Sequence, residues 1–186
     1  MKNIILSIAL ILILPLFIVG CDNDSNAQLT STELNMIFSG SFIPAPEKTD
    51  TNDDGRPSSL RTYQGQSTFG NSTITIIDEF AEPIAPANCP LNDLEFDLVR
   101  GEFVIRVGNG DLLLGTIESG YSCFDPIAGQ SEIYEEAILT DGTGQFAGVS
   151  GTVVIKTSSI FQNTTAVNGF ASGGSTGEVM GTIEIQ

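Results

Sequence analysis

Short runs of β-branched and aromatic residues, separated by glycine, asparagine and aspartate, follow one another from residue 33 to the end of the chain. β-branched and aromatic side chains favour strands, whereas Gly, Asn and Asp favour tight turns. Asn109-Gly110 lies between two apolar runs and is typical of a β-hairpin, because both residues tolerate positive φ. The chain therefore alternates between strand and turn signals.

The candidate strands cover residues 36–42, 73–77, 94–99, 102–107, 112–117, 120–124, 132–140, 151–157 and 180–185, with a weak one near 166–171. Residues 132–139 could also form a short helix, but their strand-like neighbours favour a strand. Many short strands with turns between them predict an all-β fold. We expect a single antiparallel β-barrel of about eight strands, or a barrel-like sandwich.

The N-terminus has a different pattern, in which Lys2 precedes an uncharged apolar run over residues 4–19. This run is shorter than the ~20 residues of a membrane-spanning helix and is typical of a secretory signal. It ends in Ile18-Val19-Gly20-Cys21, which resembles the lipobox of bacterial lipoproteins. The resemblance implies cleavage before Cys21, lipid attachment to its sulfur, and an exported protein anchored to the cell envelope; which membrane or face stays open.

These features divide the chain into a signal peptide (1–20), a lipidated cysteine with a flexible tether (21–32) and a β-barrel domain (33–186). The full chain has 7 basic and 23 acidic residues, and removal of Lys2 with the signal leaves a net charge of −17. Such a charge argues against nucleic acid as a partner and against a barrel that lies flat on anionic lipid. We expect a membrane contact through the lipid alone.

Two cysteines remain in the domain, Cys89 and Cys123. A lone cysteine pair in an exported protein predicts a disulfide.

The chain contains no histidine, which excludes the usual serine-histidine-aspartate triad. Ser175, in its Gly/Ser-rich setting, is therefore interpreted as a loop residue. Glu135 and Glu136 would point to opposite faces of a strand, and we interpret them as part of a solvated face. We therefore predict no catalytic residue.

A glycine-rich stretch before residue 155 is the most distinctive motif of the domain. Its pattern is made by Gly142, Thr143, Gly144, Phe146, Gly148 and Gly151. This pattern resembles a segment of the allene oxide cyclase and dirigent barrels, although those families often have a glycine where this chain has Asp141. The resemblance implies a barrel that can enclose an apolar ligand, but it transfers no catalytic residue. The glycines permit tight turns, and we expect Phe146 to plug one end of the core.

A second motif lies at Asp50, Asn52 and Asp54, followed by Gly55. It resembles the start of the EF-hand and dockerin calcium loops, in which these oxygens converge on one cation. The pattern then departs from those families, because position twelve of the loop is Arg61 and not an acid. A Ca²⁺ site and a solvated acidic turn are both left open.

Three functions are consistent with these observations. The leading hypothesis is a non-catalytic, lipid-anchored envelope protein that binds a small apolar ligand or an envelope protein partner, or plays a structural role. The alternatives are an enzyme or guiding protein of the allene-oxide-cyclase or dirigent type, and a calcium-stabilised surface or adhesion module. The interior of the barrel distinguishes them, since an open apolar cavity favours a ligand and a filled one favours a partner surface.

Overall fold

The computed structural model describes residues 29–42, 58–161 and 173–186. Eight strands and one short 3₁₀ helix make up this part of the chain. They are β1 (Thr30–Phe42), β2 (Ser59–Ser67), β3 (Gly70–Phe80), β4 (Leu94–Val107), β5 (Leu112–Asp125), β6 (Gln130–Gly142), η1 (Gly144–Phe146), β7 (Ser150–Phe161) and β8 (Gly173–Ile185). Among the described residues, no helix is long and apolar enough to cross a membrane.

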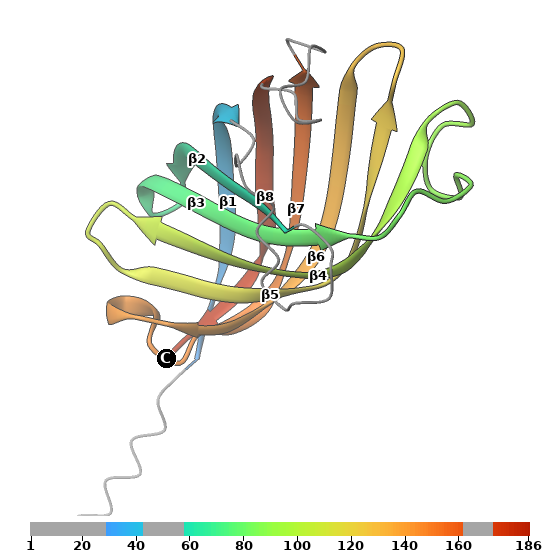
Figure 1. Cartoon of the computed structure of the whole chain (residues 1–186). Helices are drawn as coiled ribbons and strands as arrows, with labels where there is room; N and C mark the ends of the chain where they lie inside the picture. The colour runs from blue at the N-terminus through green and yellow to red at the C-terminus, as the bar shows by residue number, and fades with distance from the viewer. Residues whose placement is uncertain (1–28, 43–57, 162–172) are drawn as a thin grey trace, which may run out of the picture.

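Each strand pairs antiparallel with the next, and β8 pairs with β1 to close the barrel (Figure 1). The closing ladder runs the full length of both strands, from Thr30 opposite Ile185 to Phe42 opposite Gly173. The predicted all-β barrel is thus confirmed, and closure excludes the sandwich. Closure also removes free sheet edges, which would otherwise be open to pairing with other chains.

Several strands are longer than expected. The candidates 94–99 and 102–107 form the single strand β4, and 112–117 and 120–124 form β5. β1 begins at Thr30, so residues 30–32, which we expected in the tether, pair with β8 instead. Residues 132–140 lie in β6, as the preference for a strand over a helix required.

β2 was not among the predicted strands. The usual alternation of apolar residues inside and polar residues outside is partly reversed in β2, because Arg61 and Ser67 are buried while Leu60 is exposed. A strand with polar residues toward the interior and an apolar residue toward solvent gives no normal amphipathic signal. This polar inner face turns out to belong to the candidate site.

The barrel has two distinct ends. The near end holds the start of β1, the turns β2–β3 and β4–β5, η1 and the C-terminus, which is marked in Figure 1. The far end holds the end of β1, the start of β2, the long β3–β4 connection, the β5–β6 turn, the end of β7 and the start of β8. The first described strand therefore starts at the near end.

The near half of the interior is filled with apolar side chains. The largest fully buried ones are Tyr63, Phe38, Phe103, Phe146, Leu34, Met36, Ile74, Ile76, Ile105, Leu113, Ile155 and Ile183. Phe146 closes the near end, as predicted, and is fully buried. Glycines set up this end: Gly144 and Gly148 have positive φ (58° and 73°), and a side chain at Gly142 would overlap Phe146.

Candidate functional site

The interior changes from apolar to polar toward the far end. The buried polar residues that face this half of the lumen are Arg61, Asp78, Ser122, Ser131, Glu135, Thr157, Ser159 and Ser175. Four of the serines form two hydrogen-bonded pairs, Ser122 with Ser131 (3.0 Å) and Ser159 with Ser175 (2.7 Å). Buried charge is costly unless it is paired, so the charged members of this set define the candidate site.

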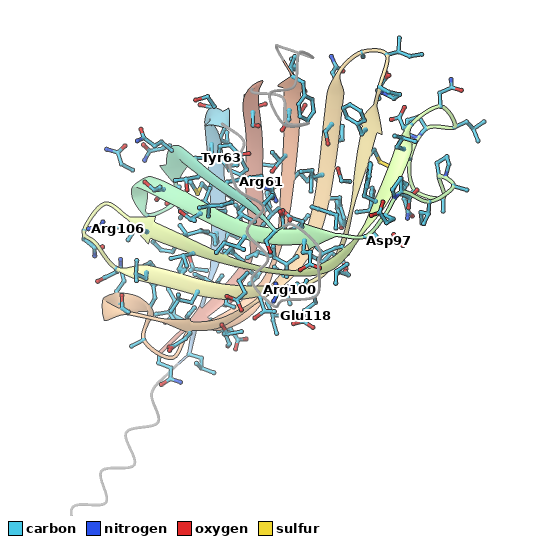
Figure 2. All side chains as sticks on the ribbon, viewed as in Figure 1. Arg61, Tyr63, Asp97, Arg100, Arg106 and Glu118 are labelled. Carbon is cyan, nitrogen blue, oxygen red and sulfur yellow. A yellow bond between two sulfur atoms is a disulfide. The ribbon has the colours of Figure 1, made fainter. Side chains whose placement is uncertain are left out.

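Arg61 is the centre of this site. Its Nη2 donates to Glu135 Oε1 at 2.9 Å and also contacts the Asp78 carboxylate, while its Nη1 donates to Thr157 Oγ1 at 3.4 Å. β2 and β6 are four strands apart in a closed barrel of eight, so the Arg61 side chain crosses the lumen. Figure 2 shows Arg61 and Tyr63 projecting from β2. We call Arg61, Asp78 and Glu135 the lumen cluster.

The lumen cluster holds two carboxyl groups against one guanidinium. Burial raises the pKa of Glu135 to about 8; Arg61 opposes this shift, and the charge and hydrogen bonding of Asp78 add to it. Burial alone would lower the pKa of Arg61, but Asp78 and Glu135 outweigh that effect and raise it, so the guanidinium stays charged. Ser59 Oγ donates a further hydrogen bond to Asp78.

Several buried polar atoms around the cluster have no hydrogen-bond partner among the described residues. They are Arg61 Nε, Tyr63 Oη and Glu135 Oε2 in the lumen, and Glu79 Oε1 next to it along β3. The Tyr63 ring itself is well packed, stacked on Phe38 with 5.0 Å between centroids. Buried polar groups normally find a partner, so these atoms add to the polar character of this half of the lumen.

A groove on the outside of the barrel wall lies next to the lumen cluster. The β4–β5 register passes from Asp97 opposite Tyr121 to Gly101 opposite Ile117, which leaves residues 98–100 between two paired stretches. A groove of about 560 Å³ lies here, and Asp78 is among its lining residues together with Arg100 and Glu118, both labelled in Figure 2. Arg100 Nε also pairs with the buried Glu79 at 2.8 Å.

The far end carries braced turns. Cys89 and Cys123 form the predicted disulfide, with 5.5 Å between their Cα atoms, and tie the β3–β4 connection to β5. The buried Glu95 carboxylate accepts hydrogen bonds from the backbone N–H groups of Ala87 (2.5 Å), Asn88 (2.7 Å) and Cys89 (3.2 Å). These bonds, the Asn88 backbone N–H above all, lower the pKa of Glu95.

The β5–β6 turn is braced in the same way. Asp125 Oδ1 accepts from the backbone N–H groups of Ile127 (2.8 Å) and Ala128 (2.9 Å), and Gly129 takes the positive φ of 63° that closes the turn. At the tips of these two connections Leu91 and Ile127 are each 90% exposed. Leu60, Ile84, Leu94 and Ile160, also at the far end, are exposed too.

The residues proposed from sequence have different outcomes. Cys21, Asp50, Asn52 and Asp54 lie outside the described residues, so lipidation and the Ca²⁺ site stay predictions. Within the described ranges, no group of three or more acidic or cysteine side chains is arranged to hold a metal ion.

Two interpretations of single residues were wrong. Ser175 lies in β8, buried against Ser159, and not in a loop. Glu135 and Glu136 do point to opposite faces, but only Glu136 is solvated, because Glu135 turns into the lumen toward Arg61. One sequence signal for the site was available. Arg61 and Tyr63 lie two residues apart and so share one face of a strand, while Leu60 lies on the opposite, exposed face.

No protein-family model, curated protein or solved structure matches the chain. The chemistry of the site therefore rests on its own geometry. That geometry offers two features: a charged cluster inside the lumen, and exposed aliphatic side chains on braced turns at the far end.

Proposed function

We propose that the protein is a non-catalytic, lipid-anchored protein of the bacterial cell envelope that binds a partner protein with the far end of its barrel. The observation that carries the proposal is the pair Leu91 and Ile127, two aliphatic side chains that are 90% exposed on turns held in place by hydrogen bonds and a disulfide. Both turns belong to the far end, and exposed apolar side chains concentrated at one end of a protein favour a binding surface.

The position of the anchor supports this orientation. Cys21 precedes Thr30 by nine residues, and a chain of that length spans at most about 30 Å. Thr30 lies at the near end of the barrel. A lipid on Cys21 would keep the near end close to the membrane and leave the far end free to meet a partner.

The braced turns also suit binding in energetic terms. A surface that is already rigid loses little conformational entropy when a partner binds, so more of the contact energy appears as affinity. Acidic residues such as Glu82 and Glu132 lie close to the exposed aliphatic side chains in the chain and are exposed themselves. The partner we expect therefore has an apolar patch with basic residues around it.

The filled near half favours a partner over a small apolar guest. Phe38, Phe103 and Phe146 are each at most 2% exposed and fill interior volume that an apolar guest would need. Arg61 then crosses the lumen above them. The calcium-stabilised surface module remains a second candidate, which depends on Asp50, Asn52 and Asp54.

The test uses the full chain in its own cell, with a photo-crosslinking amino acid in place of Ile127. Ala147, an exposed residue of a near-end turn, is the matched control position. We expect one discrete crosslinked protein from position 127, its loss when Leu91→Asp is added, and none from position 147. The purified partner should then bind the wild-type protein and bind the Leu91→Asp variant at least tenfold more weakly. Equal crosslinking from both positions, or none from position 127, would contradict the proposal.

The anchor is tested separately. Cys21→Ser should move the protein from the membrane fraction to the soluble fraction and abolish incorporation of a labelled fatty acid. A variant that stays in the membrane fraction and still carries the label would show that Cys21 is not the lipidated residue.

A further inference from the structure

The lumen cluster has more negative than positive charge in a place that water reaches poorly. Asp78 and Glu135 are each at most 1% exposed, and the guanidinium that faces both of them belongs to a single residue, Arg61. One guanidinium can balance one carboxylate. Two ionised carboxylates at one buried site repel each other and raise the cost of ionising the second.

We propose that the lumen cluster is a binding site for a single proton, held by the carboxyl group of Glu135, and that it makes the stability of the barrel depend on the pH of its surroundings. This inference does not depend on the partner proposed for the far end. The bound proton makes the cluster neutral overall, with Arg61 balanced by one carboxylate.

The surroundings of Glu135 support a proton and not a second cation. The polar or titratable groups described at this level are Arg61 and Tyr63 of β2, Asp78 of β3 and Thr157 of β7, together with Ser59 of β2, which is hydrogen-bonded to Asp78. From β5 the backbone of Gly120 faces Glu135, and a side chain at position 120 would overlap the β6 backbone. The Arg100–Glu79 pair is already matched in charge. No nearby basic side chain other than Arg61 is described that could replace the proton.

The lumen cluster lies close to the outer surface at one point. Asp78 belongs to the cluster and is also among the residues that line the groove at β4 and β5, although its side chain is fully buried. The other groove residues include Arg100 and Glu118, which make the groove polar.

The sign of the pH dependence follows from the pKa of Glu135, which is about 8 in the folded protein against 4.5 for an ordinary glutamate. Between these two values the folded chain holds a proton that the unfolded chain has lost. The contribution of this group to stability is fully present below pH 4.5 and is lost as the pH rises toward 8. For one proton, the folding equilibrium constant falls about tenfold for each pH unit in this window.

The experiment is urea unfolding of the mature lipoprotein in detergent, at intervals from pH 5 to pH 9. We expect the wild-type unfolding midpoint to fall between pH 5 and pH 8, and Glu135→Gln to remove this trend. Glu136→Gln, the neighbouring residue on the exposed face of β6, should keep the wild-type trend. The same pH dependence in wild type and Glu135→Gln would overturn the proposal.

A second measurement covers the case in which Glu135→Gln does not fold. Infrared spectra of the wild-type protein at pH 6.5 should contain the carbonyl band of a protonated carboxylic acid, and this band should disappear above pH 9. Ordinary exposed carboxyl groups are ionised at pH 6.5 and do not contribute. Absence of the band at pH 6.5 would show that the lumen cluster holds no proton.

Discussion

The ring of Phe146 meets the ring of Phe69 edge to face, with 4.9 Å between their centroids. Phe146 is the last residue of the 3₁₀ helix η1 between β6 and β7, and Phe69 lies in the β2–β3 turn, so the pair joins two connections at the near end. Aromatic pairs in this geometry stabilise a protein beyond the area that they bury. The contact explains why a turn residue is more completely buried than most strand residues.

Phe146→Ala should therefore lower stability strongly. Loss of a fully buried aromatic ring leaves a cavity at the near end, and such changes cost about 3–5 kcal/mol. We expect a clear fall in Tm and in the urea midpoint. The matched control is Gln145→Ala, one residue earlier and exposed, which should change the Tm little. Similar Tm values for both variants would show that Phe146 does not plug the core.

Arg61→Met should destabilise the barrel more than the loss of a surface charge would. Without the guanidinium, Asp78 and Glu135 are two buried acids with no counter-ion, and breaking a buried pair in this way costs roughly 3–5 kcal/mol. The loss of stability in Arg61→Met should be larger at pH 8 than at pH 5, because more of the buried carboxyl groups are ionised at pH 8. Urea unfolding at both pH values gives the measurement.

The triple variant Arg61→Met, Asp78→Asn, Glu135→Gln separates charge from packing. It removes all three charges of the lumen cluster while it keeps side chains of similar size. We expect it to recover much of the stability that Arg61→Met loses. A triple variant as unstable as the single one would mean that the arginine acts through its packing and not through its charge.

The main features of the fold could be predicted because most strands follow the ordinary rule. Residues 73–77 are β-branched, and Ile74 and Ile76 are buried, so their pattern reflects a normal core-facing strand. The Asn109-Gly110 turn forms as expected, with Gly110 at a φ of 96°. Local sequence and tertiary environment agree at these positions, and patterns are informative where that agreement holds.

The lumen cluster could not be predicted, because at its positions the local sequence pattern and the tertiary environment do not agree. Arg61 was considered only as the residue that breaks a calcium-loop pattern, and Glu135 only as half of an exposed acidic pair. Both face inward, and the two residues lie 74 positions apart in the sequence, on opposite sides of the barrel. Periodicity gives the face of a strand, but it cannot say that a polar residue will find a counter-charge across a lumen. Closure of the barrel decides that.

The double variant Cys89→Ser, Cys123→Ser should be less stable than the wild-type protein by roughly 3–4 kcal/mol, because the disulfide closes a loop with a sequence separation of 34. Addition of a reductant should lower the Tm of the wild-type protein and leave that of the double variant unchanged. A wild-type Tm that does not respond to complete reduction would show that the crosslink contributes little, and that hydrogen bonds hold the β3–β4 connection without it.

Gly115→Ala should destabilise the barrel by overlap in its interior. A Cβ atom at this position would collide with the Phe103 ring and with the Ile138 carbonyl oxygen. Overpacking of this kind typically costs about 1–3 kcal/mol. Gly174→Ala, also in a strand but with open space at the Cβ position, is the control and should be close to neutral. Equal Tm values for the two variants would contradict the packing described around Phe103.

Glu95→Gln should loosen the β3–β4 connection while the barrel stays folded. The carboxylate accepts from three successive backbone N–H groups, and an amide is a weaker acceptor than a charged carboxylate. We expect faster hydrogen exchange at Ala87, Asn88 and Cys89 in the variant, measured by NMR, with exchange in β6 and β7 unchanged.

The pKa of Glu95 is lowered in the folded protein, so the contribution of Glu95 to stability is present above the ordinary value of 4.5 and is lost as the pH falls through the lowered value. Acid should therefore loosen the wild-type connection and have little further effect on Glu95→Gln. Glu82→Gln, an exposed residue of the same connection, should behave like the wild-type protein; if it also speeds exchange at Asn88, net charge and not the Glu95 hydrogen bonds holds the turn that presents Leu91.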